Sequence, residues 1–364
     1  MRKSLKIVVI GSTGKLGSRL LNFSKKNDID IYAATCFKNS YKLNSQKNKY
    51  SIKNTFVLSD KNENSNFLKF LKNKIDIIYF LDFGSNSLIY LDHFLKNNKN
   101  STIAIANKEM IIAGGKIIFK RIKKSNCRFI SLDSEHFSLK NNLLSNNIKK
   151  IFITASGGPF YFSKLKSFKK VNLKQVLSHP KWKMGTNNLI DSSNFMNKIL
   201  EIFELSYIYD IPLEKLDFVI SKNAFIHSII LYDDGIISFN CFKNDMLIAL
   251  IYPLTSNGIV KNYISSEPYI FNEKNLMLKN NFDKRFNFFK YYKKMIQFDH
   301  SRQILMMLLN NYAQSLYLNN RLQYHEIIPF IMKRLNNMDT KTSLTSLSKI
   351  VDFINNFKSK NQYE

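Results

Sequence analysis

Cysteine is scarce in this chain, with three among 364 residues, Cys36, Cys127 and Cys241. Because they are far apart in the sequence and odd in number, they predict neither a disulfide framework nor a zinc site, and they fit a reducing, cytoplasmic location. Apolar runs of the roughly 18 to 20 residues that a membrane-spanning helix requires are also lacking, so we expect no membrane partner. The length suits an enzyme of two or three domains.

Acidic residues are in the minority. Asp and Glu number 27 against 55 Lys and Arg, which gives a formal net charge of +28. Such a charge ordinarily suggests nucleic acid or an anionic membrane as a partner. The lysines, however, are spread along the chain among asparagine, isoleucine and phenylalanine, without a basic tail or a nucleic-acid-binding motif. We therefore expect no specific nucleic-acid partner and interpret the bias as one of nucleotide composition.

The amino-terminal region reads as a strand at Lys6–Ile10, a glycine-rich turn and a helix at Lys15–Lys25. Gly11 permits the tight turn, Gly14 lets the backbone approach a pyrophosphate, and Gly17 permits close helix packing. Such spacing is weak evidence alone, since similar turns occur without ligands. Three further expected strands, separated by helical stretches, imply an open parallel sheet. They span residues 29–34, 75–81 and 101–106.

The segment after the second expected strand indicates which dinucleotide binds. NAD enzymes place an acidic residue about 20 residues after the glycine turn, yet no Asp or Glu occurs between Asp30 and Asp60. The residues that follow the strand are Phe37, Lys38 and Asn39. A cation there attracts a 2′-phosphate, so NADP is favoured over NAD. The alternative is that Lys38 is one more lysine in a lysine-rich chain.

Polar groups that suit catalysis are concentrated between Ser131 and Glu201. Asp133 and Glu135 directly follow the apolar run Phe129–Leu132. If that run is a strand, the two carboxylates point the same way at its carboxyl end, where they could hold a hard divalent cation.

A helical pattern of apolar residues extends from Ser192 to Tyr209. Asn197 and Glu201 are four apart and share one face of that helix, with Lys198 beside them. Glu201 would add a third carboxylate to a cation site, and amide, ammonium and hydroxyl groups are expected around a phosphate. The hydroxyls of that set are those of Ser156 and Ser192.

The stretch Gln175–Asn188 has the features of a mobile lid. It contains the chain's single tryptophan, Trp182. A lone tryptophan is more often a core anchor, but one flanked by Lys181 and Lys183 is poorly placed for a core.

The remaining chain predicts a mixed sheet and then helices. Alternating runs predict strands, with a hairpin turn at Asp234-Gly235, and these should extend the second sheet and form a subunit edge. The strands are expected at residues 149–154, 216–221, 227–233 and 236–241, and the helices at 302–318, 324–336 and 343–357.

Several separated motifs together resemble the 1-deoxy-D-xylulose 5-phosphate reductoisomerase family. The resemblance is specific from about residue 5 to about residue 255 and weak beyond. The motifs span residues 11–17, 106–109, 133–136, 156–160, 179–185 and 196–201.

The resemblance implies an α/β fold and a cytoplasmic, homodimeric oxidoreductase with isomerase activity. It implies a Rossmann-like NADPH-binding domain at residues 1–130 and an α/β catalytic domain with a mixed sheet at 131–262. A linker at 263–299 and a small carboxyl-terminal helical domain at 300–364 would follow. The reaction would be the NADPH- and metal-dependent rearrangement and reduction of 1-deoxy-D-xylulose 5-phosphate to 2-C-methyl-D-erythritol 4-phosphate, in isoprenoid precursor synthesis.

The resemblance also implies residue roles. The metal, Mg, Mn or Co, would bind Asp133, Glu135 and Glu201. The catalytic residues would be Lys108, Glu135, His179 and Glu201. The substrate would contact Lys108, Ser134, Glu135, Ser156, His179, Trp182, Ser192, Asn197, Lys198 and Glu201. NADPH would contact Gly11, Thr13, Gly14, Lys15, Leu16, Phe37, Lys38, Asn39, Asn107, Glu109, Gly185 and Met246, although a core methionine is an alternative for the last.

The chain departs from the family pattern at Ser85–Ser87, at Asn187 and at Ser221–Ala224. None of these is a residue assigned to the metal or the phosphate. Three hypotheses follow: the reductoisomerase, another NADPH oxidoreductase or a relative that binds cofactor without turnover, and a basic nucleic-acid-binding protein that rests on net charge alone.

Overall fold

The computed structural model describes residues 5–142, 147–179, 185–260, 277–279, 281–338 and 342–360. The chain divides into two compact units. The first runs to Phe137 and includes the segment that begins at Asp245; the second comprises Ser138–Asn244 and the later described residues. Residues 245–260 therefore group with the first unit, whereas the sequence-based division placed them in the catalytic domain. The four predicted domains stay a prediction.

The first unit contains a six-stranded sheet in the order β3-β2-β1-β4-β5-β6, with all neighbouring strands parallel. This confirms the open parallel sheet. The strand order reverses between β1 and β4, and open sheets of this kind bind dinucleotides beyond the carboxyl ends of the strands at that point. The strands are β1 (Ile7–Ile10), β2 (Ala33–Cys36), β3 (Asn54–Val57), β4 (Ile77–Phe80), β5 (Thr102–Ile105) and β6 (Arg128–Ser131).

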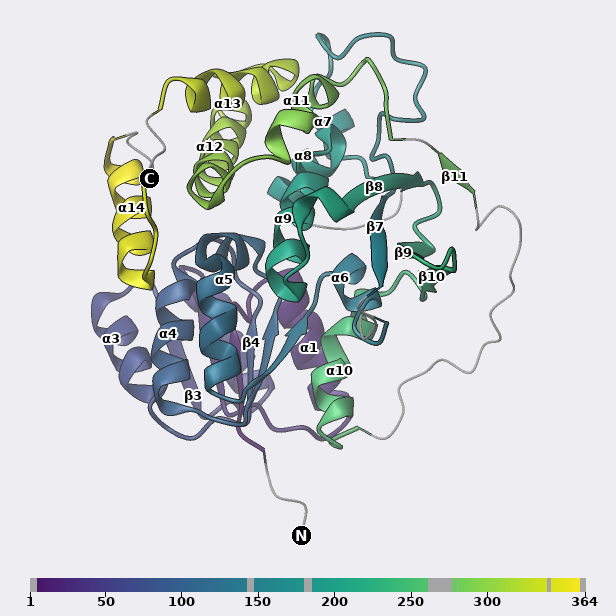
Figure 1. The fold of residues 1–364 in the computed structure, drawn as a ribbon. Helices are drawn as coiled ribbons and strands as arrows, with labels where there is room; N and C mark the ends of the chain where they lie inside the picture. Colours follow the sequence, from purple (N-terminus) through teal and green to yellow (C-terminus); the bar gives the residue numbers. More distant parts are fainter. Residues whose placement is uncertain are drawn as a thin grey trace. The chain divides into compact units, whose positions relative to one another are not determined.

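Helices cover this sheet because its central strands are apolar on both faces. Every residue of β1 and β4 is buried, as expected of a parallel sheet between two helix layers. Within this unit α4 lies beside α5, and α1 beside α10 (Figure 1). The helices are α1 (Lys15–Lys26), α2 (Ser40–Lys49), α3 (Lys61–Phe70), α4 (Ser87–Asn97), α5 (Lys108–Lys124), α6 (Ser134–Ser138) and α10 (Met246–Ser256).

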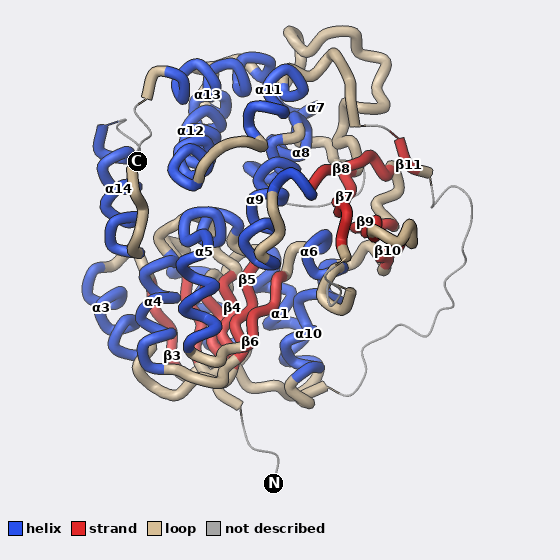
Figure 2. Tube along the Cα trace, in the orientation of Figure 1, coloured by secondary structure: helices blue, strands red, loops and turns tan. Residues whose placement is uncertain are grey.

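The second unit contains a mixed sheet in the order β10-β9-β7-β8-β11 (Figure 2). β7 pairs parallel with β8 and antiparallel with β9, while β9 and β10 form the predicted hairpin. Gly235, at φ +87°, supplies the left-handed backbone of that turn. The strands are β7 (Ile148–Ala155), β8 (Leu216–Ser221), β9 (Ile226–Tyr232), β10 (Ile237–Cys241) and β11 (Leu278–Lys279).

The helices of the second unit include the three that the carboxyl-terminal sequence predicts. Those three are α12 (His300–Leu318), α13 (Ile327–Asn336) with the short helix η3 (Tyr324–Glu326) before it, and α14 (Leu347–Lys360). The others are α7 (Leu173–Val176), α8 (Thr186–Asn194), α9 (Met196–Tyr209), η1 (Leu213–Lys215) and α11 (Phe288–Met295). No helix in the described part of the chain combines the length and apolar composition needed to cross a membrane.

Three local expectations differ from the structure. The helix expected to begin at Ser192 is two helices, α8 and α9, separated by Phe195 at φ +70°. Phe195 is 1% exposed and packs on Phe286 and Phe289, so tertiary burial stabilises a break that apolar periodicity does not reveal. The expected linker at 263–299 contains β11 and α11 among its described residues. Finally, no strand is expected at β3 from the sequence. This strand has two polar residues, Asn54 and Thr55, and all four of its residues are only partly buried, so it lacks the apolar run of the central strands.

We predict that Gly17→Ala lowers the free energy of unfolding by about 1–3 kcal/mol. A Cβ at Gly17 would lie 2.5 Å from both the Cα and the carbonyl oxygen of Ser12, which are backbone atoms that cannot rotate away. Urea unfolding measures the change.

The matched control is Gly185→Ala, because a Cβ at Gly185 meets nothing within 4 Å among the described residues and its φ is −66°. This control should change stability by less than about 0.5 kcal/mol. Equal losses in the two variants would contradict the role assigned to the close contact.

Candidate active site

The glycine turn between β1 and α1 lies at the switch point of the first sheet. Gly11 has φ +81°, and a Cβ there would lie 2.6 Å from the backbone nitrogen of Asp82, just beyond β4. Gly14 is the N-cap of α1, whose first residues are Lys15 and Leu16. The turn therefore presents backbone N–H groups and a helix amino terminus, which suit a pyrophosphate.

A second part of the predicted cofactor region follows β2. Phe37 and Lys38 are exposed, and Asn39 caps α2 by accepting a hydrogen bond from the backbone N–H of Lys42 at 3.0 Å. The Lys42 ammonium donates to the carbonyl oxygen of Thr13 at 2.7 Å, which places a further cation against the glycine turn. Sequence reasoning missed Lys42, because nothing in a lysine-rich segment distinguishes it from its neighbours.

A partly buried carboxylate, that of Asp82, lies just beyond β4, and a buried one, that of Glu109, lies at the start of α5. Asn107, the N-cap of α5, donates to Asp82 Oδ1 at 3.1 Å, and Ser87 donates to the other carboxylate oxygen. Burial raises the pKa of Asp82 to about 6, although these hydrogen bonds oppose the shift. Burial also raises the pKa of Glu109, with the lowering effect of Lys108 opposed by Asp82. Asp82 is not among the site residues predicted from the sequence, although a carboxylate two residues after an apolar strand could have indicated it.

Asp133 and Glu135 lie on the loop and helix that follow β6. The strand ends at Ser131, so strand alternation does not orient the two carboxylates, contrary to the sequence argument. Asp133 instead precedes α6 and accepts a hydrogen bond from the backbone N–H of Glu135 at 3.0 Å. Ser134 donates to the Glu135 carboxylate. A helix start, rather than a strand end, therefore brings these groups together.

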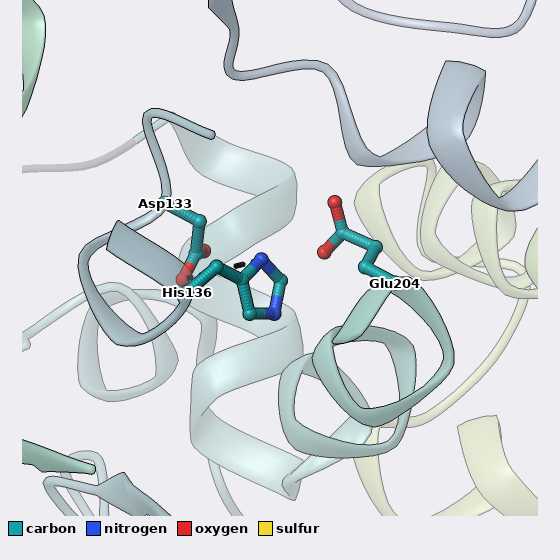
Figure 3. Close-up of side chains that lie close together, drawn as sticks. All are labelled: Asp133, His136 and Glu204. Atoms are coloured by element: carbon teal, nitrogen blue, oxygen red, sulfur yellow. Dashed lines mark ion pairs between the residues drawn. The ribbon is translucent and has the colours of Figure 1, made fainter. Parts of the chain in front are cut away.

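Two basic side chains of the same unit approach Asp133. The Lys108 ammonium lies 3.4 Å from Asp133 Oδ2, and Lys108 is 9% exposed. Nδ1 of the fully buried His136 lies 4.0 Å from Asp133 Oδ1 (Figure 3). The third side chain drawn there, Glu204, belongs to α9 of the second unit. Lys108, predicted to lie at the metal and substrate, thus contacts a predicted metal ligand.

The second unit brings together most of the residues expected around the phosphate. A Cβ at Gly158 would lie 2.7 Å from the carbonyl oxygen of Ser192, so the turn that carries Ser156 packs directly on α8. Ser156 Oγ is hydrogen-bonded to His179 Nε2 at 3.0 Å. Burial, and secondarily the charge of Lys198, lowers the pKa of His179 to about 4. His179 is therefore neutral at pH 7.

Asn197, Lys198 and Glu201 lie together on α9, as their spacing in the sequence predicts. Asn197 donates to one oxygen of Glu201, and the Lys198 ammonium lies 2.5 Å from the other. Lys198 is 6% exposed and Glu201 2% exposed, so this ion pair is buried. The helix thus offers an amide, an ammonium and a carboxylate within one turn.

The remaining predicted site residues belong to other elements or lie outside the described part of the chain. Trp182 and the centre of the expected lid, residues 180–184, are outside the described residues. Gly185 is the N-cap of α8 in the second unit. Met246 is the first residue of α10 in the first unit and is half-buried.

Comparison with known proteins gives a consistent result. The family model for the 1-deoxy-D-xylulose 5-phosphate reductoisomerase C-terminal domain matches residues 129–209. The reductoisomerase of Pelagibacter ubique (strain HTCC1062) is 32% identical over 380 residues, covering 96% of each chain. That of Thermoanaerobacter pseudethanolicus is 28% identical over 366 residues, covering 93% of this chain and 94% of its own.

Two solved structures share the fold. The reductoisomerase from Zymomonas mobilis in complex with NADPH aligns with a TM-score of 0.82 at 21% identity and covers 100% of both chains. A DOX-P reductoisomerase in complex with NADPH, fosmidomycin and magnesium also has a TM-score of 0.82 at 21% identity, covering 98% of this chain and 97% of its own. The expected α/β fold class is confirmed.

The partly buried carboxylate of Asp82 leads to a prediction about pH. Its pKa is about 6 in the folded chain against an ordinary 3.8, so the folded state binds more protons between these values. The carboxylate's contribution to stability therefore falls as pH rises from about 4 to about 6. Asp82→Asn removes this dependence, and the variant should gain stability relative to the wild type across that window, by up to about 3 kcal/mol.

Urea unfolding at pH 4, 5, 6 and 7 measures the difference. The exposed Asp30 provides the control, since Asp30→Asn makes the same chemical change without removing a desolvated charge. A stability difference between Asp82→Asn and the wild type that does not change with pH would show that the fold does not desolvate the Asp82 carboxylate.

Proposed function

This chain belongs to the 1-deoxy-D-xylulose 5-phosphate reductoisomerase family, and on that premise we propose how its own residues carry out the reaction. The substrate is 1-deoxy-D-xylulose 5-phosphate, which is rearranged and reduced to 2-C-methyl-D-erythritol 4-phosphate with NADPH and a divalent metal, in isoprenoid precursor synthesis. The observation that carries the residue assignment is the cluster of Ser156, His179, Ser192 and Lys198 in the second unit, which offers a phosphate one buried cation and several hydrogen-bonding groups.

In this proposal the phosphate of the substrate is held within the second unit. Lys198 supplies the positive charge, and the hydroxyls of Ser156 and Ser192 supply hydrogen bonds. The Asn197 amide adds a further donor on the same helix. Because Lys198 already has a buried carboxylate partner in Glu201, its long side chain is held in place before the phosphate arrives.

We assign the metal to Asp133, Glu135 and Glu201. All three are carboxylates, the donor type that Mg²⁺ and Mn²⁺ prefer; Co²⁺ is the third candidate. Asp133 and Glu135 adjoin each other at the start of α6, and Glu201 is buried on α9. When bound, the cation supplies Lewis-acid stabilisation of negative charge on the substrate oxygens.

Lys108 and His179 contact the substrate oxygens in this assignment. The Lys108 ammonium, held near Asp133, donates hydrogen bonds as a cation. The neutral ring of His179 offers one N–H donor and one acceptor nitrogen, so it orients a hydroxyl without adding charge. Ser134, beside Glu135, and Trp182 complete the proposed substrate contacts.

Most of the residues that would hold NADPH belong to the first unit. Gly11, Thr13, Gly14, Lys15 and Leu16 would hold its pyrophosphate, and NADPH, when bound, supplies the hydride. Phe37, Lys38 and Asn39 would hold the 2′-phosphate, with Lys42 as an additional cation. We assign further cofactor contacts to Asn107, Glu109, Gly185 and Met246.

We also propose a cytoplasmic homodimer. In the described structure Cys36, Cys127 and Cys241 are free thiols, which supports a reducing compartment. Within the described residues β10 is an edge strand of its sheet, and Ile237 and Phe239 on it are 53% and 51% exposed. An unpaired apolar edge invites pairing with a second copy. We propose no specific nucleic-acid partner for the basic surface.

The central test follows NADPH absorbance with 1-deoxy-D-xylulose 5-phosphate and Mg²⁺ or Mn²⁺. We expect oxidation that needs the sugar phosphate, stops with a chelator and is far slower with NADH. Glu201→Gln should lower turnover by more than about 100-fold, because it removes a metal ligand. NADPH affinity should change less than about twofold, since the glycine turn belongs to the other unit.

The matched control for this variant is Glu214→Gln, an exposed glutamate in η1, which should keep full turnover. Loss of turnover and NADPH binding together in Glu201→Gln would count against the metal assignment. No oxidation by wild-type protein that is folded and binds NADPH would instead favour a relative that binds cofactor without turnover.

The dimer is tested by Ile237→Lys, which places a charge on the apolar edge. We expect the variant to elute as a monomer in size-exclusion chromatography with light scattering, at micromolar concentrations where the wild type is a dimer. Ile89→Lys, on α4 with the isoleucine 39% exposed, is the control and should leave the dimer intact. A variant that dimerises as the wild type does would overturn the proposed edge.

A further inference from the structure

A buried carboxylate, Asp191, directly precedes Ser192 on α8. Asp191 is 5% exposed, and its Oδ1 accepts hydrogen bonds from two amides of α12: from Asn310 Nδ2 at 2.9 Å and from Gln314 Nε2 at 2.5 Å. Both amide side chains are fully buried. They are four residues apart, so one face of α12 presents both donors to the same carboxylate.

Both amides turn their N–H groups toward Asp191, and in that orientation their own carbonyl oxygens accept no hydrogen bond from the described part of the chain. Among the described residues, no hydrogen-bond donor reaches the side-chain oxygens Asn310 Oδ1 and Gln314 Oε1, both of which are buried. Leaving a buried acceptor unsatisfied costs about 1–3 kcal/mol, and burying a carboxylate costs more unless it is well hydrogen-bonded. This arrangement includes both a buried carboxylate and two unsatisfied amide oxygens. Apolar side chains at these positions would avoid both free-energy costs, so packing alone does not explain the three polar residues.

The backbone on either side of Ser192 is also held by the carboxyl-terminal region. Gln314 Nε2 lies 3.3 Å from the carbonyl oxygen of Asn187, at the start of α8. The Tyr324 hydroxyl donates to the carbonyl oxygen of Ser193 at 2.9 Å. On another side, Gly158 leaves room for the Ser192 carbonyl at a distance that a Cβ would not permit. Ser192 is thus fixed from α12, from η3 and from the glycine turn.

We propose that Asp191, Asn310 and Gln314 are positioning residues that hold the Ser192 hydroxyl for the substrate phosphate. This inference rests on the proposed function, because it assumes that Ser192 contacts that phosphate. It assigns α12, a helix of the carboxyl-terminal region, a part in substrate affinity, although α12 carries no residue predicted to touch the substrate. The three residues act through Ser192, so they affect phosphate binding and not the hydride transfer.

The test is Gln314→Met, which preserves length and helix propensity but removes the donor. We expect the KM for 1-deoxy-D-xylulose 5-phosphate to rise about tenfold, the effect of one hydrogen bond to a charged group. The kcat should stay within about threefold, and the KM for NADPH should not change. If this variant does not fold, Asp191→Asn, which keeps the side-chain shape, should show the same split between KM and kcat.

The matched control is Gln303→Met on the same helix. Gln303 is also buried, accepts from the Tyr207 hydroxyl at 2.5 Å and donates to the Phe298 carbonyl at 2.7 Å. These are the hydrogen-bond partners of its side chain among the described residues, and neither belongs to α8. Its loss should lower stability and leave both KM values unchanged. An unchanged substrate KM in Gln314→Met, or an equal rise in both variants, would overturn the proposal.

Failure of the proposed function is distinguishable from failure of this inference. Wild-type protein that does not oxidise NADPH with the sugar phosphate would contradict the function. Inorganic phosphate is then the probe, and calorimetry should show weaker phosphate binding in Gln314→Met than in the wild type or Gln303→Met. Equal phosphate affinity in all three proteins would overturn the positioning role.

Discussion

Burial of carboxylates is the constraint on which the rest of the candidate site depends. Asp82, Asp133, Asp191 and Glu201 are all removed from water to a large degree, and each has donors aimed at it. A buried carboxylate without such donors would destabilise the fold or take up a proton. Hydrogen bonding to these four carboxylates therefore fixes the positions of the amides, hydroxyls and lysines that surround them, and groups of these types are suited to recognise phosphates.

Close backbone approach is the second constraint, and glycine makes it possible. Gly11 lets the turn between β1 and α1 pack against the backbone just beyond β4, and Gly158 lets the turn that carries Ser156 pack against α8. In both places a side chain would meet backbone atoms that cannot move aside. The two candidate ligand regions are therefore built alike, with a glycine turn packed closely against the backbone of another element.

The large positive charge serves the proposed chemistry in a few places and is solvated elsewhere. Lys42 and Lys198 are tied to backbone or carboxylate partners, and both lie where an anionic group of the cofactor or substrate is expected. Most other lysines are exposed and follow no pattern in the sequence. Net charge alone thus gives no guide to function, whereas the partners of Lys42 and Lys198 support the binding roles proposed for them.

Local pattern in the sequence determined the α/β class, the glycine turn, the Asp234-Gly235 hairpin and the shared face of Asn197 and Glu201, because each depends on residues only a few positions apart. Tertiary structure alone decided the break at Phe195, the burial of Asp82 and the pairing of Asp191 with Gln314. These arise between segments distant in sequence, where packing and desolvation act, and neither leaves a periodic trace in the chain. Residue pattern also predicted a cation site of three carboxylates, and motif resemblance supplied most of the predicted cofactor residues, whereas the contacts of Asp191 and Gln314 around Ser192 are visible only in the fold.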